Sequence, residues 1–166
     1  DDRGTGGGVC TVTIDKHTII ALVEDKPGVL TRVASMFRRR GFNIANLAVG
    51  RSEMPELSRM TFEVRGNSND VEQVTKQLFK LIDVVKVADI TKEETVAREL
   101  ALIKVKAPAY SRSEIIQMVD IFRATIVDVA SDSLIIEVTG DEAAINSLIG
   151  SLERFDILEI MRTGRV

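Results

Sequence analysis

A stretch of the sequence between residues 25 and 43 holds groups that could recognise a zwitterionic small molecule. A turn containing Pro27 and Gly28 opens a predicted helix, where the backbone N–H groups of Gly28 and Val29 would face a carboxylate. Asp25 could accept a hydrogen bond from an ammonium group, and Asn43 offers both a donor and an acceptor. Together these groups suit an α-amino acid. The alternative is that the same residues form only a tight turn and a strand start.

Residues that could carry out a reaction are scarce. The chain has one histidine, His17, and one cysteine, Cys10. Histidine is the commonest general acid–base group, but His17 stands at the edge of a predicted strand, so we expect a structural or surface role for it. Cys10 lies in a glycine-rich stretch without a base, and a closed zinc site needs about four Cys or His ligands. We therefore predict no catalytic residue, no metal site and no enzyme activity for the chain alone.

Composition excludes further classes of protein. The net charge is −3 and only 4% of the residues are aromatic, whereas nucleic-acid binders present a basic face or stacking aromatics, so we predict no nucleic-acid partner. A copper chaperone would need two cysteines after its first strand, where this chain has Asp25 and Lys26. No apolar run approaches the roughly 20 residues of a membrane span. We expect no membrane association and a cytoplasmic location, or a plastid stroma if the source is a plant or alga.

The sequence pattern places the candidate binding groups next to a strand, a helix and a second strand. A β-branched run from His17 to Glu24 predicts the first strand. Apolar residues at helical spacing from Val29 to Phe37 predict a helix that ends at Gly41. Residues 38–40 are arginines in the last turn of this helix, where cations stabilise the negative end of the helix dipole.

The remaining elements follow in a repeating order. The pattern predicts strands at residues 42–50, 57–64 and 84–90, and a second helix from 69 to 82 with an apolar face made of Val71, Val74, Leu78, Leu81 and Ile82. A charged segment follows, and the order then restarts. Strands are predicted at 98–107, 124–131, 133–140 and 157–162. Two helices are also predicted in this half of the chain. The first carries the apolar residues Ile115, Ile116, Val119 and Phe122, and the second carries Ala144, Ile145, Leu148, Ile149 and Leu152.

The predicted fold class is therefore α+β, with two tandem ferredoxin-like βαββαβ units. We assign residues 1–16 to a flexible glycine-rich tail, 17–91 to the first unit, 92–97 to a linker and 98–166 to the second unit. A unit of about 70 residues has a small core and gains stability by docking, so we expect the chain to form a homodimer.

The stretch EDKPGVLTRVASMFRRRGFNIANLAVG resembles the start of an ACT domain, and more specifically the small regulatory subunit of acetohydroxyacid synthase, also called acetolactate synthase. The resemblance continues through LSRMTFEV, RELALIKV, LIIEVTG and MRTGRV, so it covers nearly all of residues 17–166. It implies that the first unit is an ACT domain for effector binding and dimerisation, and that the second unit contacts the catalytic subunit. Such a subunit acts in branched-chain amino-acid biosynthesis, where it activates the catalytic subunit and confers feedback inhibition by valine or a related branched-chain amino acid.

The resemblance also implies which residues bind the effector. In this family the site lies between two ACT domains, with the loop after the first strand of one domain and the second-strand start of the other. Here the strand start consists of Asn43 and Ile44. The loop consists of Asp25, Lys26, Pro27, Gly28, Val29 and Leu30. Asp25 stands where many family members have asparagine, which leaves the ligand preference of this chain open.

Cofactors and partners follow from the same resemblance. Thiamine diphosphate, FAD and Mg²⁺ are expected on the catalytic (large) subunit, and none on this chain. One alternative function is a stand-alone ACT-domain amino-acid sensor that regulates another enzyme or a transcription factor. A small enzyme is a third possibility, and it would have to form acetolactate from pyruvate alone, which we do not expect.

Overall fold

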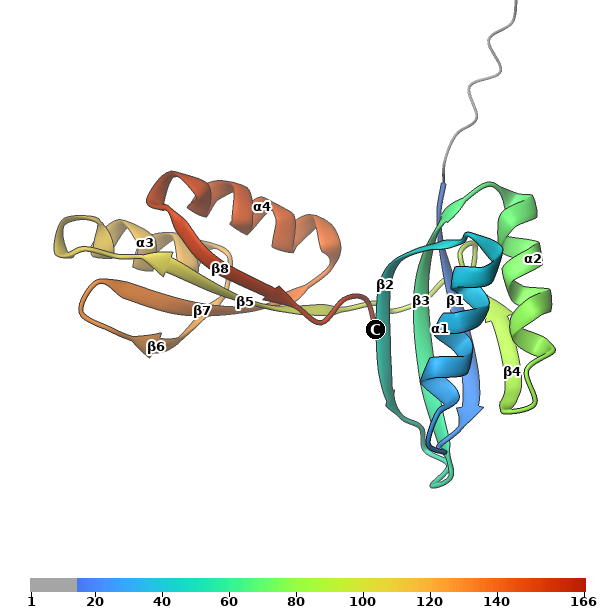
Figure 1. The fold of residues 1–166 in the computed structure, drawn as a ribbon. Helices are drawn as coiled ribbons and strands as arrows, with labels where there is room; N and C mark the ends of the chain where they lie inside the picture. The colour runs from blue at the N-terminus through green and yellow to red at the C-terminus, as the bar shows by residue number, and fades with distance from the viewer. Residues whose placement is uncertain (1–14) are drawn as a thin grey trace, which may run out of the picture. The chain divides into compact units, whose positions relative to one another are not determined.

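The computed structural model describes residues 15–166. Cys10 and nearly all of the predicted tail at residues 1–16 lie outside the described residues. The chain divides between Lys92 and Glu93 into two compact units. Each unit has a four-stranded sheet and two α-helices that lie on one face of that sheet (Figure 1).

The N-terminal unit has the element order βαββαβ. Its strands and helices are β1 (Asp15–Glu24), α1 (Val29–Arg40), β2 (Asn43–Arg51), β3 (Leu57–Gly66), α2 (Ser68–Phe79) and β4 (Val84–Asp89). The strand order β2-β3-β1-β4 places β1 inside the sheet and β2 and β4 at its two edges. The arrows of β1 and β2 point in the same direction in Figure 1, opposite to that of β3 between them.

Helix α1 begins and ends next to glycines in the left-handed region. Gly28 has φ +86° before the first helical residue, and Gly41 has φ +70° after the last. The N–H of Gly41 donates to carbonyls of the last helical turn, which contains three arginines. The predicted helix end and its basic last turn are therefore confirmed.

Helix α2 ends earlier than its apolar pattern indicates. Val71, Val74 and Leu78 are buried as predicted, but the helix ends at Phe79, and Ile82 is 91% exposed. The prediction of a helix to residue 82 with Ile82 on its apolar face is wrong. The N–H groups of Lys80 and Leu81 bond to carbonyls three residues back, so the last turn tightens and the chain leaves the helix.

The core of the N-terminal unit lies between its sheet and its helices. Alternate residues of β1, among them Ile19 and Ala21, are fully buried and pair with Phe62 and Met60 of β3. The ring of Phe62 stacks on Phe37 of α1 with 5.2 Å between the ring centroids. This packing fixes α1 against the sheet and so fixes the turn that precedes it.

The C-terminal unit repeats the same order. Its elements are β5 (Glu99–Lys106), α3 (Ala109–Ile121), β6 (Thr125–Val129), β7 (Ser133–Gly140), α4 (Glu142–Leu152), a short 3-10 turn η1 (Glu153–Phe155) and β8 (Ile157–Arg162). The strand order is β6-β7-β5-β8. The fold class predicted from the sequence, α+β with two βαββαβ units, is confirmed.

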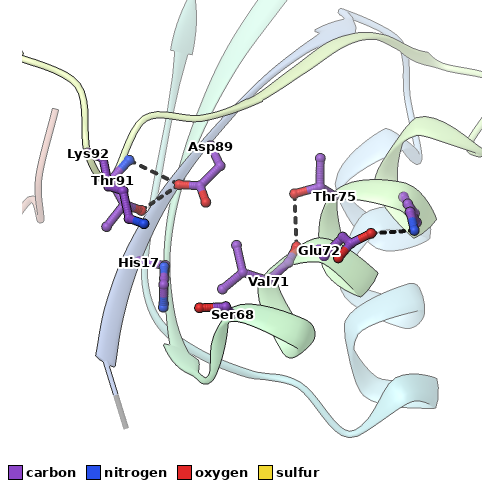
Figure 2. Close-up of a pocket in the computed structure, with 9 residues that line it drawn as sticks. His17, Ser68, Val71, Glu72, Thr75, Asp89, Thr91 and Lys92 are labelled. Atoms are coloured by element: carbon purple, nitrogen blue, oxygen red, sulfur yellow. Dashed lines mark hydrogen bonds and ion pairs between the residues drawn. The ribbon is translucent and has the colours of Figure 1, made fainter. Parts of the chain in front are cut away.

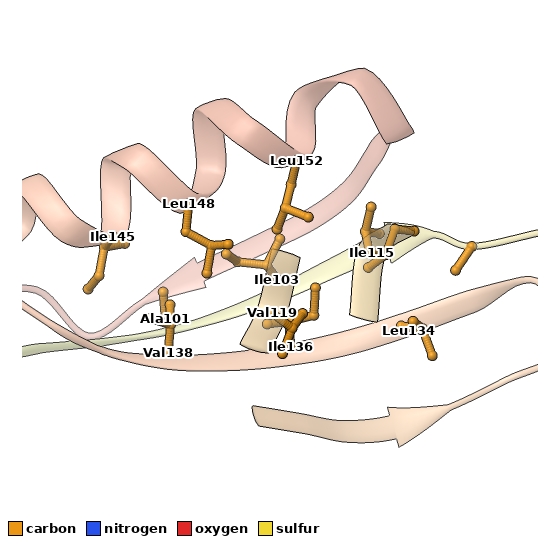
Figure 3. Packing of buried hydrophobic residues seen from close by; sticks show 12 residues of the cluster. Ala101, Ile103, Ile115, Val119, Leu134, Ile136, Val138, Ile145, Leu148 and Leu152 are labelled. Carbon is orange, nitrogen blue, oxygen red and sulfur yellow. The ribbon is translucent and has the colours of Figure 1, made fainter. Parts of the chain in front are cut away.

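Figure 3 shows how α4 packs on the sheet of this unit, with Ile145, Leu148 and Leu152 directed toward Ile103 and its neighbours. These side chains are fully buried. Ile116 of α3, predicted on the buried face, is instead 39% exposed. The buried residues of α3 include Ile115 four positions before Val119, and Ile116 points about 100° away from that stripe.

The two units share a detail at the end of their first helix. Arg123 follows α3 with φ +54°, in the same left-handed region that Gly41 occupies after α1. The next strand then begins two residues later in each unit, at Asn43 and at Thr125. Thr125 is therefore the counterpart of Asn43.

Candidate functional site

The loop after β1 is held at one end of the N-terminal sheet by backbone hydrogen bonds. The Asp25 N–H donates to the Glu56 carbonyl at 2.8 Å, and the Glu24 N–H donates to the Asp83 carbonyl at 2.8 Å. The Lys26 N–H bonds back to the Glu24 carbonyl at 2.9 Å. The loop is thus fixed to the starts of β3 and β4, while the side chains of Asp25 and Lys26 stay exposed.

Backbone N–H groups without a partner cluster where this loop enters α1. Among residues 15–166, nothing accepts from the N–H of Gly28, Leu30 or Thr31. The Val29 N–H donates to the Lys26 carbonyl at 3.4 Å, so the prediction that it is open to a ligand is wrong. The remaining groups lie at the positive end of the α1 dipole and suit an anion such as a carboxylate.

Arg32 stands beside this turn and was missed by sequence reasoning. Its Nε donates to Asp83 Oδ2 at 2.6 Å, and its side chain is 47% exposed. Its Nη1 would lie 3.2 Å from a Cβ placed on Gly28. The spacing from Gly28 to Arg32, one helical turn, is the signal that could have revealed it.

Ion pairing at the loop leaves one carboxylate available. Lys26 Nζ lies 2.6 Å from Glu24 Oε2. The hydrogen bond and the charge of Glu24 raise the pKa of Lys26, so Lys26 stays cationic and held by Glu24. Asp25 has no ion-pair partner within the described part of the chain. Its carboxylate is therefore open to an ammonium group.

Apolar residues flank the polar groups of the loop. Val29 is 4% exposed and anchors the first turn of α1 in the core. Leu30 is 47% exposed, and Pro27 is also exposed. Leu30 can therefore contact the side chain of a bound molecule, whereas Val29 positions the backbone.

Asn43 and Ile44 lie at the other end of the sheet. β1 and β2 run in the same direction, so the residues after β1 and the residues that begin β2 are at opposite ends (Figure 1). The helix α1 that joins them has 12 residues and so spans about 18 Å. Asn43 is exposed, its amide has no partner among the described residues, and Ile44 is half-buried. One chain alone does not bring the loop and Asn43 together.

The corresponding end of the C-terminal unit is closed by an arginine. Arg112 Nη2 donates to the carbonyls of Ala107, Ala130 and Ser131 at 3.0, 2.7 and 2.9 Å. Its turn before α3, residues 107–108, contains no glycine. This unit therefore lacks the open left-handed turn of the N-terminal unit.

Comparison with known proteins gives the family. Residues 19–86 match a family described as an AHAS small subunit-like ACT domain, and residues 98–166 match one described as the small subunit of acetolactate synthase. A protein of Archaeoglobus fulgidus named probable acetolactate synthase small subunit is 57% identical over 151 residues, covering 91% of this chain and 94% of that protein. This chain belongs to the acetolactate synthase small-subunit family.

Other relatives agree with this assignment. The acetolactate synthase small subunit of Mycobacterium bovis is 52% identical over 90% of this chain and 89% of its own length. The crystal structure of the acetolactate synthase small subunit from Thermotoga maritima superposes with a TM-score of 0.86 at 44% identity, covering 92% of this chain and 96% of that one. The resemblance inferred from the sequence is confirmed, and the N-terminal unit is an ACT domain.

The relatives are named as small subunits of acetolactate synthase. Within residues 15–166, no group of three or more His, Cys, Asp or Glu side chains is arranged to hold a metal ion. None of the helices in the same part of the chain is long and apolar enough to cross a bilayer.

Proposed function

We propose that this chain is the regulatory subunit of a cytoplasmic acetolactate synthase. It binds the catalytic subunit, raises its activity and makes the complex sensitive to valine or a related branched-chain amino acid. The catalytic subunit binds thiamine diphosphate, FAD and Mg²⁺. Membership of the acetolactate synthase small-subunit family over both units supports this assignment.

The observation that carries the effector site is the position of its two halves at opposite ends of one sheet. β2 is an edge strand, so a second copy can pair with it antiparallel about a two-fold axis near its middle. That arrangement places Asn43 of one chain opposite Arg51 of the other. Arg51 ends β2 at the same end of the sheet as the loop after β1, because Glu24 pairs with the first residue of β3. Each Asn43 then lies beside the other chain's loop.

The resulting pocket matches an α-amino acid at each of its groups. The carboxylate meets the open N–H groups at the start of α1 and the Arg32 guanidinium. The ammonium meets Asp25 of one chain and the Asn43 side-chain carbonyl of the other. The aliphatic side chain contacts Leu30 and Ile44. A homodimer carries two such pockets, related by the two-fold axis.

The C-terminal unit supplies the contact with the catalytic subunit. The face of its sheet that points away from the helices, here called the open face, carries Leu102 and Met161, which pair across β5 and β8. They are 38% and 70% exposed. An exposed apolar pair on a sheet is typical of a protein–protein contact.

Regulation requires the effector to bind one state of the complex better than another. The difference in affinity between the states, typically about 1–3 kcal/mol, shifts the population of the activated complex. Effector bound across the dimer contact changes the pairing of the two ACT domains. The attached C-terminal units then change how they hold the catalytic subunit.

A thermal-shift screen of the purified chain against the twenty amino acids tests the effector. Ligand at a hundred times its Kd adds about 2.7 kcal/mol to the stability of a folded state that alone binds it. We expect stabilisation by a branched-chain amino acid. No shift with any amino acid, in the chain alone or after reconstitution with the catalytic subunit, would refute the effector site.

Mixing two inactive variants tests whether the pocket is shared between chains. Gly28→Asp damages only the loop, and Asn43→Ala damages only the strand start. In a mixed dimer one pocket contains both changes and the other contains neither, so co-refolding the two variants should restore valine binding to one pocket. Each variant refolded alone should remain inactive. Mixtures that never bind valine would exclude a shared site, because a site within one chain cannot be repaired in this way.

A further inference from the structure

A cavity on the far side of the ACT domain is not used by the effector site. It has a volume of about 460 Å³ and lies between the start of β1, the end of β4 and helix α2. Figure 2 shows His17 directed toward Ser68 and Val71 of α2, with Asp89 and Thr91 on the β4 side. A volume of this size holds a small organic molecule.

His17 is the feature that distinguishes this cavity. The residue is 7% exposed, and neither ring nitrogen has a hydrogen-bond partner among the described residues. Buried polar side chains in proteins almost always have a partner, because an unpaired one costs its full desolvation penalty. The imidazole is therefore suited to a ligand that enters the cavity and pairs with it. Of the structural or surface role expected for His17, its burial excludes the surface position.

Each carboxylate beside the cavity already accepts a hydrogen bond through one of its oxygens. Glu72 accepts from Lys76 at 2.5 Å, and this hydrogen bond lowers the pKa of Glu72. Asp89 Oδ1 accepts from both the N–H and the hydroxyl of Thr91. The Thr75 hydroxyl donates to the Val71 carbonyl at 2.9 Å.

Donor groups also line the cavity. Lys92 lines the cavity and has no ion-pair partner within residues 15–166. The Ser68 hydroxyl also lines the cavity and has no hydrogen-bond partner in the same part of the chain. Together with the His17 imidazole they can donate to one anionic group. The first turn of α2 does not compete for it, since Asn67 and Asp70 already form a capping box. A ligand that pairs with these donors must bring acceptor oxygens.

The floor of the cavity is apolar. Val71 is 3% exposed, and Thr75 and Lys76, one helical turn further along α2, also line the cavity. An inorganic anion would leave this surface uncovered, whereas a branched or linear aliphatic body would bury it.

We propose that this cavity binds a small organic monoanion, a carboxylate with an aliphatic body, at a site separate from the amino-acid effector site. The carboxylate pairs with the His17 imidazole and the Lys92 ammonium, and the aliphatic body packs on Val71. The proposed ligand has no ammonium group, since Glu72 is paired with Lys76 and Asp89 accepts two hydrogen bonds from Thr91.

NMR titration of the full chain tests the proposal directly. His17 is the only histidine in the sequence, so its imidazole signals are unambiguous. The probe is 3-methylbutanoate, and its matched control is the uncharged 3-methylbutanamide. We expect a saturable shift of the His17 signals with the carboxylate and at least about tenfold weaker binding of the amide. Acetate should bind about tenfold more weakly too, because it lacks the aliphatic body.

Each contrary outcome would overturn the proposal. His17 signals that move with neither probe would exclude a ligand at this imidazole. An amide that binds as tightly as the carboxylate would exclude an anion site. Inorganic phosphate that binds as tightly as 3-methylbutanoate would exclude the aliphatic body.

Variants separate this cavity from other sites on the chain. Lys92→Met should weaken 3-methylbutanoate binding by about tenfold, and Lys106→Met, the same change on an exposed strand residue of the other unit, should leave it unchanged. Gly28→Asp should also bind the probe normally. Loss of the His17 shift in Gly28→Asp would assign the probe to the effector site and refute a separate one. His17→Phe should fold and lose probe binding by calorimetry.

Discussion

Replacement of Gly28 by aspartate should abolish effector binding and leave the chain folded. Gly28 has φ +86°, where an L residue costs roughly 1–2 kcal/mol. The new Cβ would lie 3.2 Å from Arg32 Nη1, the end of a flexible side chain that can move aside. We expect a lower Tm by about 2–8 °C, since 1 kcal/mol shifts Tm by about 2–4 °C in a chain of this size.

The effect on binding comes from charge. Two carboxylates about 4 Å apart repel by about 4 kcal/mol at an effective dielectric constant near 20, and each 1.4 kcal/mol is tenfold in Kd. Arg32 and solvent offset part of this repulsion. We therefore expect the Kd for valine to rise by at least about a hundredfold in Gly28→Asp.

Gly28→Ala is the matched control, because it has the same backbone strain and the same Cβ without the charge. Isothermal calorimetry with valine should show at most about a tenfold loss in this variant. Equal losses of valine affinity in the two variants would mean that backbone strain explains the effect. Repulsion of the effector carboxylate would then have no part in it. Unchanged binding in Gly28→Asp would show that the loop after β1 is not the effector site.

Further predictions concern packing and partner contact. Leu148→Ala removes a fully buried side chain and should lower the free energy of unfolding in urea by about 2–5 kcal/mol. Ile82→Ala should change it by less than about 0.5 kcal/mol, because Ile82 is 91% exposed. Equal losses in the two variants would contradict the packing described for α4. Met161→Asp on the open face should abolish activation of the catalytic subunit, while valine should still stabilise the chain. Tyr110→Asp, at a 90% exposed position of α3, should leave activation intact. Full activation by Met161→Asp would exclude this face as the contact with the catalytic subunit.

Most of the fold was accessible from the sequence because its signals are local. Short apolar runs in β1 and β5 and helical spacing in α1 and α4 each depend on neighbours within a few positions. Gly41 ended α1 as predicted because a left-handed residue after a helix is a property of the backbone itself. Ile82 was misplaced for the opposite reason. Its apolar character fitted the stripe, but the tightening after Phe79 depends on where β4 must begin.

The candidate site was only partly accessible. The residue types of the loop and of Asn43 are visible in the sequence, but the direction of β1 and β2, which places them at opposite ends of the sheet, is a tertiary property. Arg32, in contrast, could have been found from its spacing, because it lies one helical turn after Gly28 in a helix whose start was predicted. The His17 cavity could not be predicted, since it needs α2 to lie over the first residues of β1.

The hydrogen bonds of Arg112 bear on the number of proposed effector sites in each chain. Arg112 occupies three carbonyls at the end of that unit where the ACT domain has an open glycine turn, and Thr125 stands in place of Asn43. Of the two βαββαβ units, only the ACT domain therefore has the groups of the proposed amino-acid site. We therefore predict that the proposed homodimer saturates with two effector molecules rather than four. The surface of the C-terminal unit can then change without loss of the proposed effector site.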